Sequence, residues 1–320
     1  MDRYRCFRCC CFEILEFFRS NSSANFLSLS TYLLKSKSKK MVLNRKFILE
    51  GALEEQFTMD LSYSESQEQK GIIIFCHGFK GFKDWGCWQM IANYFVENGF
   101  AFLKFNFSHN GMGLEDSVEF TALDKFATNT FGKEMKDIES VEQFIVKQLP
   151  GILPIINVGK ISIIGHSKGG VSALLYCTQY DTKIEKVCTW ASPFDFQRSW
   201  SSKFINKWRA DGVQYIKNSR TNQMMPMNIE VLEDMEINKE KYSLVNAGQK
   251  LQIPYFIIQG TNDQAVKMEE FDLLKKHFTK AKNHIILEAN HVFGGSHPYS
   301  GTELPEHTKE LVRVTKEFFS

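Results

Sequence analysis

The stretch that decides the fold is KISIIGHSKGGVSALLYCTQY, residues 160–180. Its first half, KISIIG, is typical of a buried strand, and the run from Lys168 to Tyr180 predicts a helix. Between them, G-H-S-K-G predicts a tight turn with Ser167 at its centre. A serine on such a turn is held in a strained conformation that exposes its hydroxyl, and the glycines on either side leave the necessary room. Ser167 is therefore our candidate nucleophile; the simpler alternative is a glycine-rich helix start carrying an ordinary serine.

The rest of the chain after residue 41 alternates short strand-like runs with longer amphipathic segments, which predicts a mostly parallel sheet covered by helices on both faces. Residues 45–50 and 57–63 are expected to form an opening antiparallel pair. Buried strands are expected at 71–76, 100–107, 160–165, 186–191, 254–260 and 283–289, and helices at 88–98, 131–148, 168–180, 267–278 and 305–319.

Two downstream loops hold the partners that a serine nucleophile needs. A serine hydroxyl requires a base, and the base requires a carboxylate that orients it. Asp263 follows the run PYFIIQG, and His291 follows NHIILEA. Both lie just past the carboxyl ends of expected strands, where α/β sheets gather their catalytic groups, and the order Ser, Asp, His is that of α/β-hydrolases. His297 is the rival base, and Asp195 is the rival acid.

An acyl-transfer site also needs two hydrogen-bond donors directed at the developing oxyanion. We expect one from the backbone amide of Lys168, directly after the nucleophile. The second is expected from the loop HGFKGF at 77–82, and the amide of Phe79 is the candidate. The alternative is that this loop is a plain turn at the end of a strand.

About sixty residues separate the strand ending near Ala191 from the strand beginning at Pro254, far more than a crossover needs. We expect a helical cap at about 194–250, over the carboxyl edge of the sheet. Aromatic residues of the cap and of the first loops are candidate substrate contacts, although the abundance of Phe makes a core role equally reasonable: Phe82, Trp85, Trp200 and Trp208. His109 is a candidate contact for a polar part of the substrate. Lys80, Lys83 and Asp84 lie on the same loops and could serve likewise, but charged loop residues are usually solvated, and we expect that here.

Composition and motifs argue against several other classes of protein. The chain has 320 residues with 43% hydrophobic and 24% charged residues, which is typical of a globular protein. Residues 41–320 carry 31 Lys and Arg against 34 Asp and Glu, so nothing favours nucleic acid. No phosphate loop or complete dinucleotide motif is present, His residues are scattered, and no apolar run is long enough to span a membrane. We therefore expect no cofactor, no metal and no membrane span.

Residues 1–40 differ from the rest. They are rich in Arg, Ser and Cys, and Met41 opens a stretch that reads like a natural start. We expect this segment to be an extension outside the folded domain, either not native or disordered, with an organelle transit peptide as the alternative. The scattered cysteines give no disulfide framework and favour a reducing compartment, so a cytoplasmic location is expected.

Five motifs together carry a family resemblance: HGFKGFKDWG at 77–86, FNFSHNGMG at 105–113, GHSKGG at 165–170, QGTNDQAV at 259–266 and ANHVFGG at 289–295. The chain resembles the serine α/β-hydrolases of dienelactone-hydrolase-like and serine-aminopeptidase-like type, in particular the feruloyl and cinnamoyl esterase branch. The resemblance covers residues 45–320 and specifies the catalytic machinery but no substrate. Dienelactone hydrolases use a Cys nucleophile, whereas this turn holds Ser167.

The resemblance implies a serine hydrolase acting on a small-molecule carboxylic ester, aromatic or acyl, through an acyl-enzyme. It implies that Ser167 is the nucleophile, His291 the base and Asp263 the acid, with Phe79 and Lys168 as oxyanion donors. Peptidase, aminopeptidase or thioesterase activity on the same machinery is the first alternative; an aminopeptidase would need an acid for the substrate amine, and Glu230, Glu233 and Asp234 are candidates. A catalytically silent ligand-binding protein is the second alternative.

Overall fold

The computed structural model describes residues 41–66, 69–115, 118–198 and 200–320, so the expectations for residues 1–40 lie outside the described residues. An eight-stranded sheet has the order β1-β2-β4-β3-β5-β6-β9-β10. Strands β1 and β2 pair antiparallel, as do β2 and β4, and all other pairs are parallel. The strands are β1 (Leu43–Glu50), β2 (Gln56–Tyr63), β3 (Ile72–Cys76), β4 (Ala101–Phe105), β5 (Ile161–His166), β6 (Ile184–Trp190), β9 (Tyr255–Gly260) and β10 (Lys282–Ile286).

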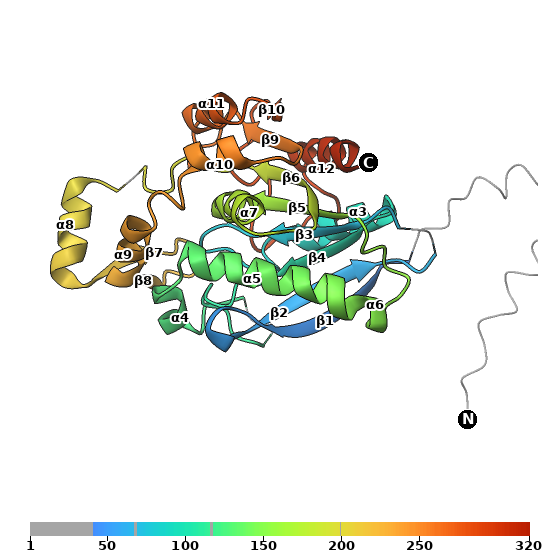
Figure 1. The fold of residues 1–320 in the computed structure, drawn as a ribbon, viewed down its shortest axis with the longest axis horizontal. Coiled ribbons are helices and arrows are strands. Elements are labelled where there is room, and N and C mark those ends of the chain that lie inside the picture. The colour runs from blue at the N-terminus through green and yellow to red at the C-terminus, as the bar shows by residue number, and fades with distance from the viewer. Residues whose placement is uncertain (1–40, 67–68, 116–117, 199) are drawn as a thin grey trace, which may run out of the picture. The chain divides into compact units, whose positions relative to one another are not determined.

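Helices cover both faces of this sheet (Figure 1). One face packs against α5 (Phe131–Gln143), α7 (Lys168–Gln179), α10 (Leu244–Lys250) and α11 (Met268–His277). The other packs against α3 (Trp88–Glu97) and α12 (Glu306–Phe319). Successive side chains of β3 divide between the two cores: Ile72, Ile74 and Cys76 join the first, and Ile73 and Phe75 join the second. A continuous apolar run is therefore what this doubly covered strand requires.

The expected pattern of strands and helices is confirmed, with two local differences. The helix expected at 131–148 is α5 followed by a π-helical turn at Phe144–Gln148, and α6 (Leu149–Ile152) continues the chain. The strand expected to be buried at 283–289 is the short edge strand β10, most of whose residues are not buried. Within the described ranges it pairs with β9 alone, so one of its sides has no neighbouring strand there.

The segment between β6 and β9 forms an insertion at one end of the sheet (Figure 1), and it is not purely helical as expected. It contains α8 (Ser202–Asp211), the antiparallel pair β7 (Val213–Lys217) and β8 (Met224–Asn228), and α9 (Ile229–Ile237). The last helix, α10, packs against α7 and α11 in the main body. A third hydrophobic cluster joins the insertion to the sheet-end loops through Phe82, Phe126, Trp208, Met225 and Leu232.

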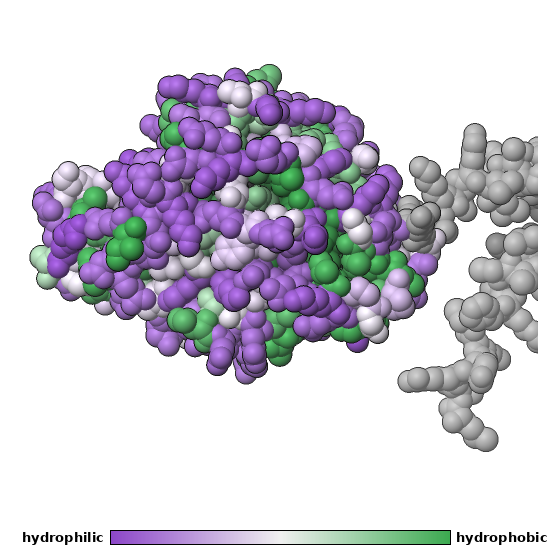
Figure 2. Space-filling model, viewed as in Figure 1, coloured by the Kyte–Doolittle hydropathy of each residue, from purple (hydrophilic) through white to green (hydrophobic). Residues whose placement is uncertain are grey.

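Polar side chains cover most of the face shown in Figure 2. Among the described residues, no helix combines the length and the apolar character needed to cross a membrane.

A buried ion cluster anchors the loop after β3. The ammonium groups of Lys83 and Lys104 both bond to Asp60, at 2.6 and 2.8 Å, and both also bond to Asp84. The Lys83 side chain is only 4% exposed, so the expectation that it is solvated is wrong. The aspartates compensate its charge inside the fold, which a residue-by-residue estimate of exposure cannot anticipate.

Replacing Lys104 by Met should lower the free energy of unfolding by about 2 to 4 kcal/mol, because two carboxylates would then share one cation in a partly buried site. Urea unfolding measures the loss. Lys136→Met, which breaks an exposed pair with Glu139, is the control and should cost less than about 1 kcal/mol. Equal losses in the two variants would contradict a special role for the cluster.

Candidate active site

Ser167 occupies the turn between β5 and α7 with φ 54° and ψ −124°, a conformation that non-glycine residues rarely adopt. The flanking glycines are required by close contacts. A Cβ on Gly165 would lie 2.4 Å from the carbonyl oxygen of Gly169, and a Cβ on Gly169 would lie 2.4 Å from the carbonyl oxygen of Cys76. Helix α7 therefore begins directly against the end of β3, and Ser167 stands at the junction.

His291 and Asp263 lie together beyond β10 and β9. Nδ1 of His291 donates to Oδ2 of Asp263 at 2.8 Å. The other oxygen, Oδ1, accepts from the amides of Ala265 and Val266 at 2.8 and 2.9 Å, and Gln259 donates to Oδ2 at 3.0 Å. Burial by itself would raise the pKa of Asp263, but its bonds to His291 and to the two amides outweigh burial and hold that pKa below its usual value. The carboxylate stays ionised and directs Nε2 of His291 away from itself.

His166 connects the serine turn to the histidine loop. Its Nε2–H donates to the carbonyl oxygen of His291 at 2.9 Å, and the two imidazole rings lie 4.9 Å apart, centroid to centroid. Burial, with the neighbouring His291 as the second cause, lowers the pKa of His166 to about 3, so His166 is neutral and serves as a donor. Among the described residues, no hydrogen bond joins the Ser167 hydroxyl to the His291 ring. Such contacts are often long in ligand-free sites and shorten when substrate binds.

Neither rival residue replaces this pair. His297 packs beside Trp85, with ring centroids 6.0 Å apart, and its Nδ1 accepts from the amide of Gly86 at 2.8 Å. Asp195 is exposed, and its Oδ1 accepts from the amide of Gln197 at 2.8 Å. The carboxylate that holds His291 is therefore that of Asp263.

The loop after β3 lies against the serine turn. A Cβ on Gly78 would come within 2.9 Å of the Ser167 Cβ. His77 fixes the loop from within, because its Nδ1–H donates to the carbonyl oxygen of Gly78 at 2.9 Å while Nε2 accepts from the Asn110 amide at 3.1 Å. Within the described part of the chain, the backbone amides of Phe79 and Lys168 donate to no other group. They are free to bind an oxygen beside Ser167.

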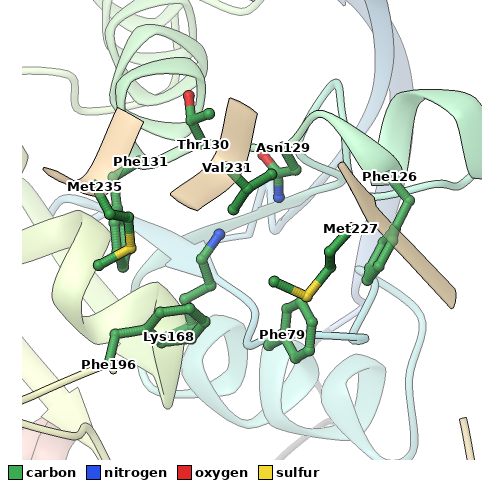
Figure 3. A pocket seen from close by; sticks show the side chains of 10 residues that line it. All are labelled: Phe79, Phe126, Asn129, Thr130, Phe131, Lys168, Phe196, Met227, Val231 and Met235. Atoms are coloured by element: carbon green, nitrogen blue, oxygen red, sulfur yellow. The ribbon is translucent and has the colours of Figure 1, made fainter. Parts of the chain in front are cut away.

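Phe79 and Lys168, the residues that carry these two amides, also line a narrow pocket (Figure 3). Its walls are mostly apolar and combine the main body with the insertion: Phe79, Phe126, Phe131, Phe196, Met227 and Met235. Asn129, Thr130 and the side chain of Lys168 are its polar lining. Residues of α9 close the side that faces the insertion.

None of the five expected substrate contacts lines this pocket. Phe82 and Trp208 are buried in the cluster beneath the insertion, and Trp85 and Trp200 pack against it. His109 is buried and bonds to the Ser108 hydroxyl at 2.8 Å. Sequence reasoning missed Phe126, Asn129, Phe131 and Phe196, and no local motif distinguishes these residues from other core aromatic or turn residues.

The fold defines a hydrolase of the α/β-hydrolase class. The chain belongs to the family described as serine aminopeptidase, S33, whose model matches residues 67–243, more than half of the chain. No curated protein matches it in sequence.

Solved structures of esterases and peptidases are similar in fold. Est1E from Butyrivibrio proteoclasticus, solved with ferulic acid bound, is 18% identical with a TM-score of 0.61, over 85% of this chain and 97% of that one. The esterase domain of a Rhodothermus marinus protein is 15% identical with a TM-score of 0.58, over 86% and 97%. Acylaminoacyl peptidase from Pyrococcus horikoshii is 17% identical with a TM-score of 0.60, over 92% and 43%. At these identities the likeness shows the fold alone.

The neutrality of His166 predicts a pH effect on stability. Its pKa is about 3 in the folded chain and 6.5 without the fold, so between these values the unfolded state binds a proton that the folded state does not. The stability that the neutral His166 contributes is present above pH 6.5 and is lost as the pH falls toward 3.

His166→Gln keeps a hydrogen-bond donor but does not titrate. When the pH falls from 6.5 to 5, the free energy of unfolding should fall in both proteins, and it should fall by about 1 to 2 kcal/mol less in the variant than in the wild type. Urea unfolding at both pH values measures the difference.

His307→Gln, on α12, is the reference for the general effect of losing a histidine. Parallel pH curves for the wild type and His166→Gln would contradict a neutral, buried His166.

Proposed function

We propose that this protein hydrolyses small carboxylic esters through a covalent acyl-enzyme, with Ser167, His291 and Asp263 as its catalytic triad. The observation that carries the proposal is the strained Ser167 turn, whose neighbour His166 contacts a His291 imidazole that a buried carboxylate already holds, with Nδ1 to Oδ2 at 2.8 Å. The amides of Phe79 and Lys168, which have no acceptor among the described residues, support it.

In the first half of the reaction, Oγ of Ser167 attacks the carbonyl carbon while Nε2 of His291 takes the hydroxyl proton. The carbonyl oxygen becomes an oxyanion and accepts from the amides of Phe79 and Lys168. Asp263 stabilises the imidazolium but keeps its own charge, consistent with its lowered pKa. When the intermediate collapses, His291 gives the proton to the departing alcohol, which leaves the acyl group on Ser167.

In the second half, a water molecule attacks the acyl-enzyme, and His291 takes its proton. Collapse of the second intermediate breaks the bond to Oγ, returns the proton to Ser167 and releases the carboxylic acid. The same donors hold both oxyanions, and each is worth about 10² to 10³ in rate.

An ester fits the pocket better than the free amine of an aminopeptidase substrate. The charged group in the pocket lining is Lys168, whose ammonium is paired with the buried Glu134 carboxylate, so the pair offers no free negative charge to a substrate ammonium group. None of the three candidate acids is among the lining residues: Glu230 and Glu233 are exposed, and Asp234 accepts from Asn238 and Tyr242 on α9 and the following turn. Turnover of aryl esters should therefore exceed turnover of aminoacyl arylamides.

Ser167→Ala and His291→Ala should each abolish labelling by a fluorophosphonate probe and lower kcat for 4-nitrophenyl esters by at least about 10⁴-fold, because nucleophile and base act as one unit. Ser202→Ala, at the exposed start of α8, is the matched control and should label as the wild type does. Ester hydrolysis that persists in Ser167→Ala would refute the proposal, and a folded wild type that neither labels nor turns over esters would indicate a ligand-binding protein instead.

Asp263→Asn should lower kcat by about 10³ to 10⁴-fold, because an amide in place of the carboxylate favours the wrong imidazole tautomer and cannot stabilise the imidazolium. Asp195→Asn is the control at the rival position. Steady-state kinetics of both variants decide the matter: a large loss in Asp195→Asn with little loss in Asp263→Asn would reverse the assignment of the acid.

A further inference from the structure

The loop after β9, which carries Asp263, is held by hydrogen bonds on two sides. Toward the triad, the amides of Ala265 and Val266 donate to Oδ1 of Asp263, at 2.8 and 2.9 Å. On the opposite side, Nη2 of Arg198 donates to the carbonyl oxygen of Ala265 at 2.7 Å. Among the described residues, no other group donates to this carbonyl oxygen. Arg198 is therefore the support of the loop on that side.

The bond from Arg198 and the bond to Asp263 share one peptide group. The carbonyl of Ala265 and the N–H of Val266 belong to the same planar unit, which is trans, so the two groups point in opposite directions. The guanidinium therefore lies at the oxygen end of this peptide, and the Asp263 carboxylate lies at its hydrogen end. Because the peptide dipole is aligned between a cation and an anion, each of the two hydrogen bonds strengthens the other.

The other amide that donates to Asp263 has no such support. The N–H of Ala265 belongs to the peptide whose carbonyl is that of Gln264, and among the described residues no group donates to this oxygen. The two amides thus bind the same carboxylate oxygen, but a cation polarises the peptide of Val266 alone.

Arg198 is itself fixed at the start of the insertion. Its Nη1 donates to the carbonyl oxygen of Asp195 at 3.1 Å. The amides of Phe194 and Asp195 in turn donate to Oε2 of Glu270, on α11, at 2.8 and 2.9 Å. Since α11 follows the Asp263 loop directly, these bonds hold the loop after β6 and the loop after β9 together, with the guanidinium between them.

We propose that Arg198 is a positioning residue for the triad: through one peptide group it strengthens the Val266 hydrogen bond that anchors Asp263. The inference rests on the proposed function, because it requires Asp263 to orient His291. With Oδ1 anchored, Oδ2 stays directed at Nδ1 of His291, at 2.8 Å. Arg198 is exposed and is not among the residues that line the pocket, so it acts on the reaction without touching the substrate.

Steady-state kinetics of Arg198→Met test this role, because the variant loses the donors and the charge but keeps an unbranched side chain. The anchored carboxylate stabilises the imidazolium, which forms only during the reaction. For 4-nitrophenyl butyrate, kcat should therefore fall about three- to tenfold while KM stays within about twofold of the wild-type value. Arg209→Met is the matched control: it removes another exposed cation of the insertion, paired with Glu236, and should leave kcat unchanged.

Amide proton chemical shifts test the peptide group directly and need no substrate. In Arg198→Met the peptide of Val266 loses its polarising cation, so the Val266 amide proton should move upfield. The Ala265 amide proton is the internal control and should move clearly less, because it bonds to the same carboxylate oxygen from another peptide. A general loosening of the loop would shift both protons alike. Arg209→Met should shift neither.

The outcomes distinguish the inference from the proposed function. Equal shifts of the two protons in Arg198→Met, or an unchanged Val266 proton, would overturn the role of Arg198 and leave the proposed function intact. An unchanged kcat, a loss confined to KM, or an equal loss in Arg209→Met would do the same. A wild type that hydrolyses no ester would overturn the proposed function, and the role of Arg198 in catalysis with it, whatever the proton shifts.

Discussion

The close approach of backbone at the serine turn is the constraint on which the site depends. Gly165 and Gly169 leave no room for a Cβ, so β5, α7 and the end of β3 meet at backbone contact distance. This contact holds Ser167 at a positive φ and brings the loop of Gly78 against it. A larger residue at Gly165 would push α7 away from β5, and one at Gly169 would push it away from the end of β3. The second change would separate the two amides that we propose as the oxyanion donors.

Burial divides the ionisable groups around this turn into neutral and charged ones. His77 and His166 lose their protons because the interior disfavours an imidazolium, and both become fixed donors to carbonyl oxygens of the site loops. The Asp263 side chain is also buried, yet hydrogen bonds from the His291 ring, the Gln259 amide and backbone amides keep its carboxylate ionised. The same burial thus yields neutral histidines that support the site loops, while the hydrogen bonds to Asp263 keep a fixed negative charge at His291.

Sequence patterns predicted the sheet well because its strands are covered on both faces and read as continuous apolar runs, as in β3. They failed where one tertiary contact decides exposure. Strand β10 was expected to be buried but lies at an edge, Lys83 is charged but buried beside Asp60, and the hairpin of β7 and β8 lies in a region expected to be helical. The expected aromatic contacts Phe82 and Trp208 turned out to be core residues, because local sequence does not distinguish a pocket wall from a packed interior.

The sequence by itself determined the α/β-hydrolase fold and placed Ser167, Asp263 and His291 at strand ends, because the strand–turn–helix motif around Ser167 and the apolar runs before Asp263 and His291 are local signals. Only the tertiary structure decided that Asp263 rather than Asp195 holds His291, that His166 ties the serine turn to the histidine loop, and that Asn129 and Lys168 share a carboxylate in an aromatic pocket. These are contacts between segments up to 125 residues apart, and such contacts depend on how the whole chain packs.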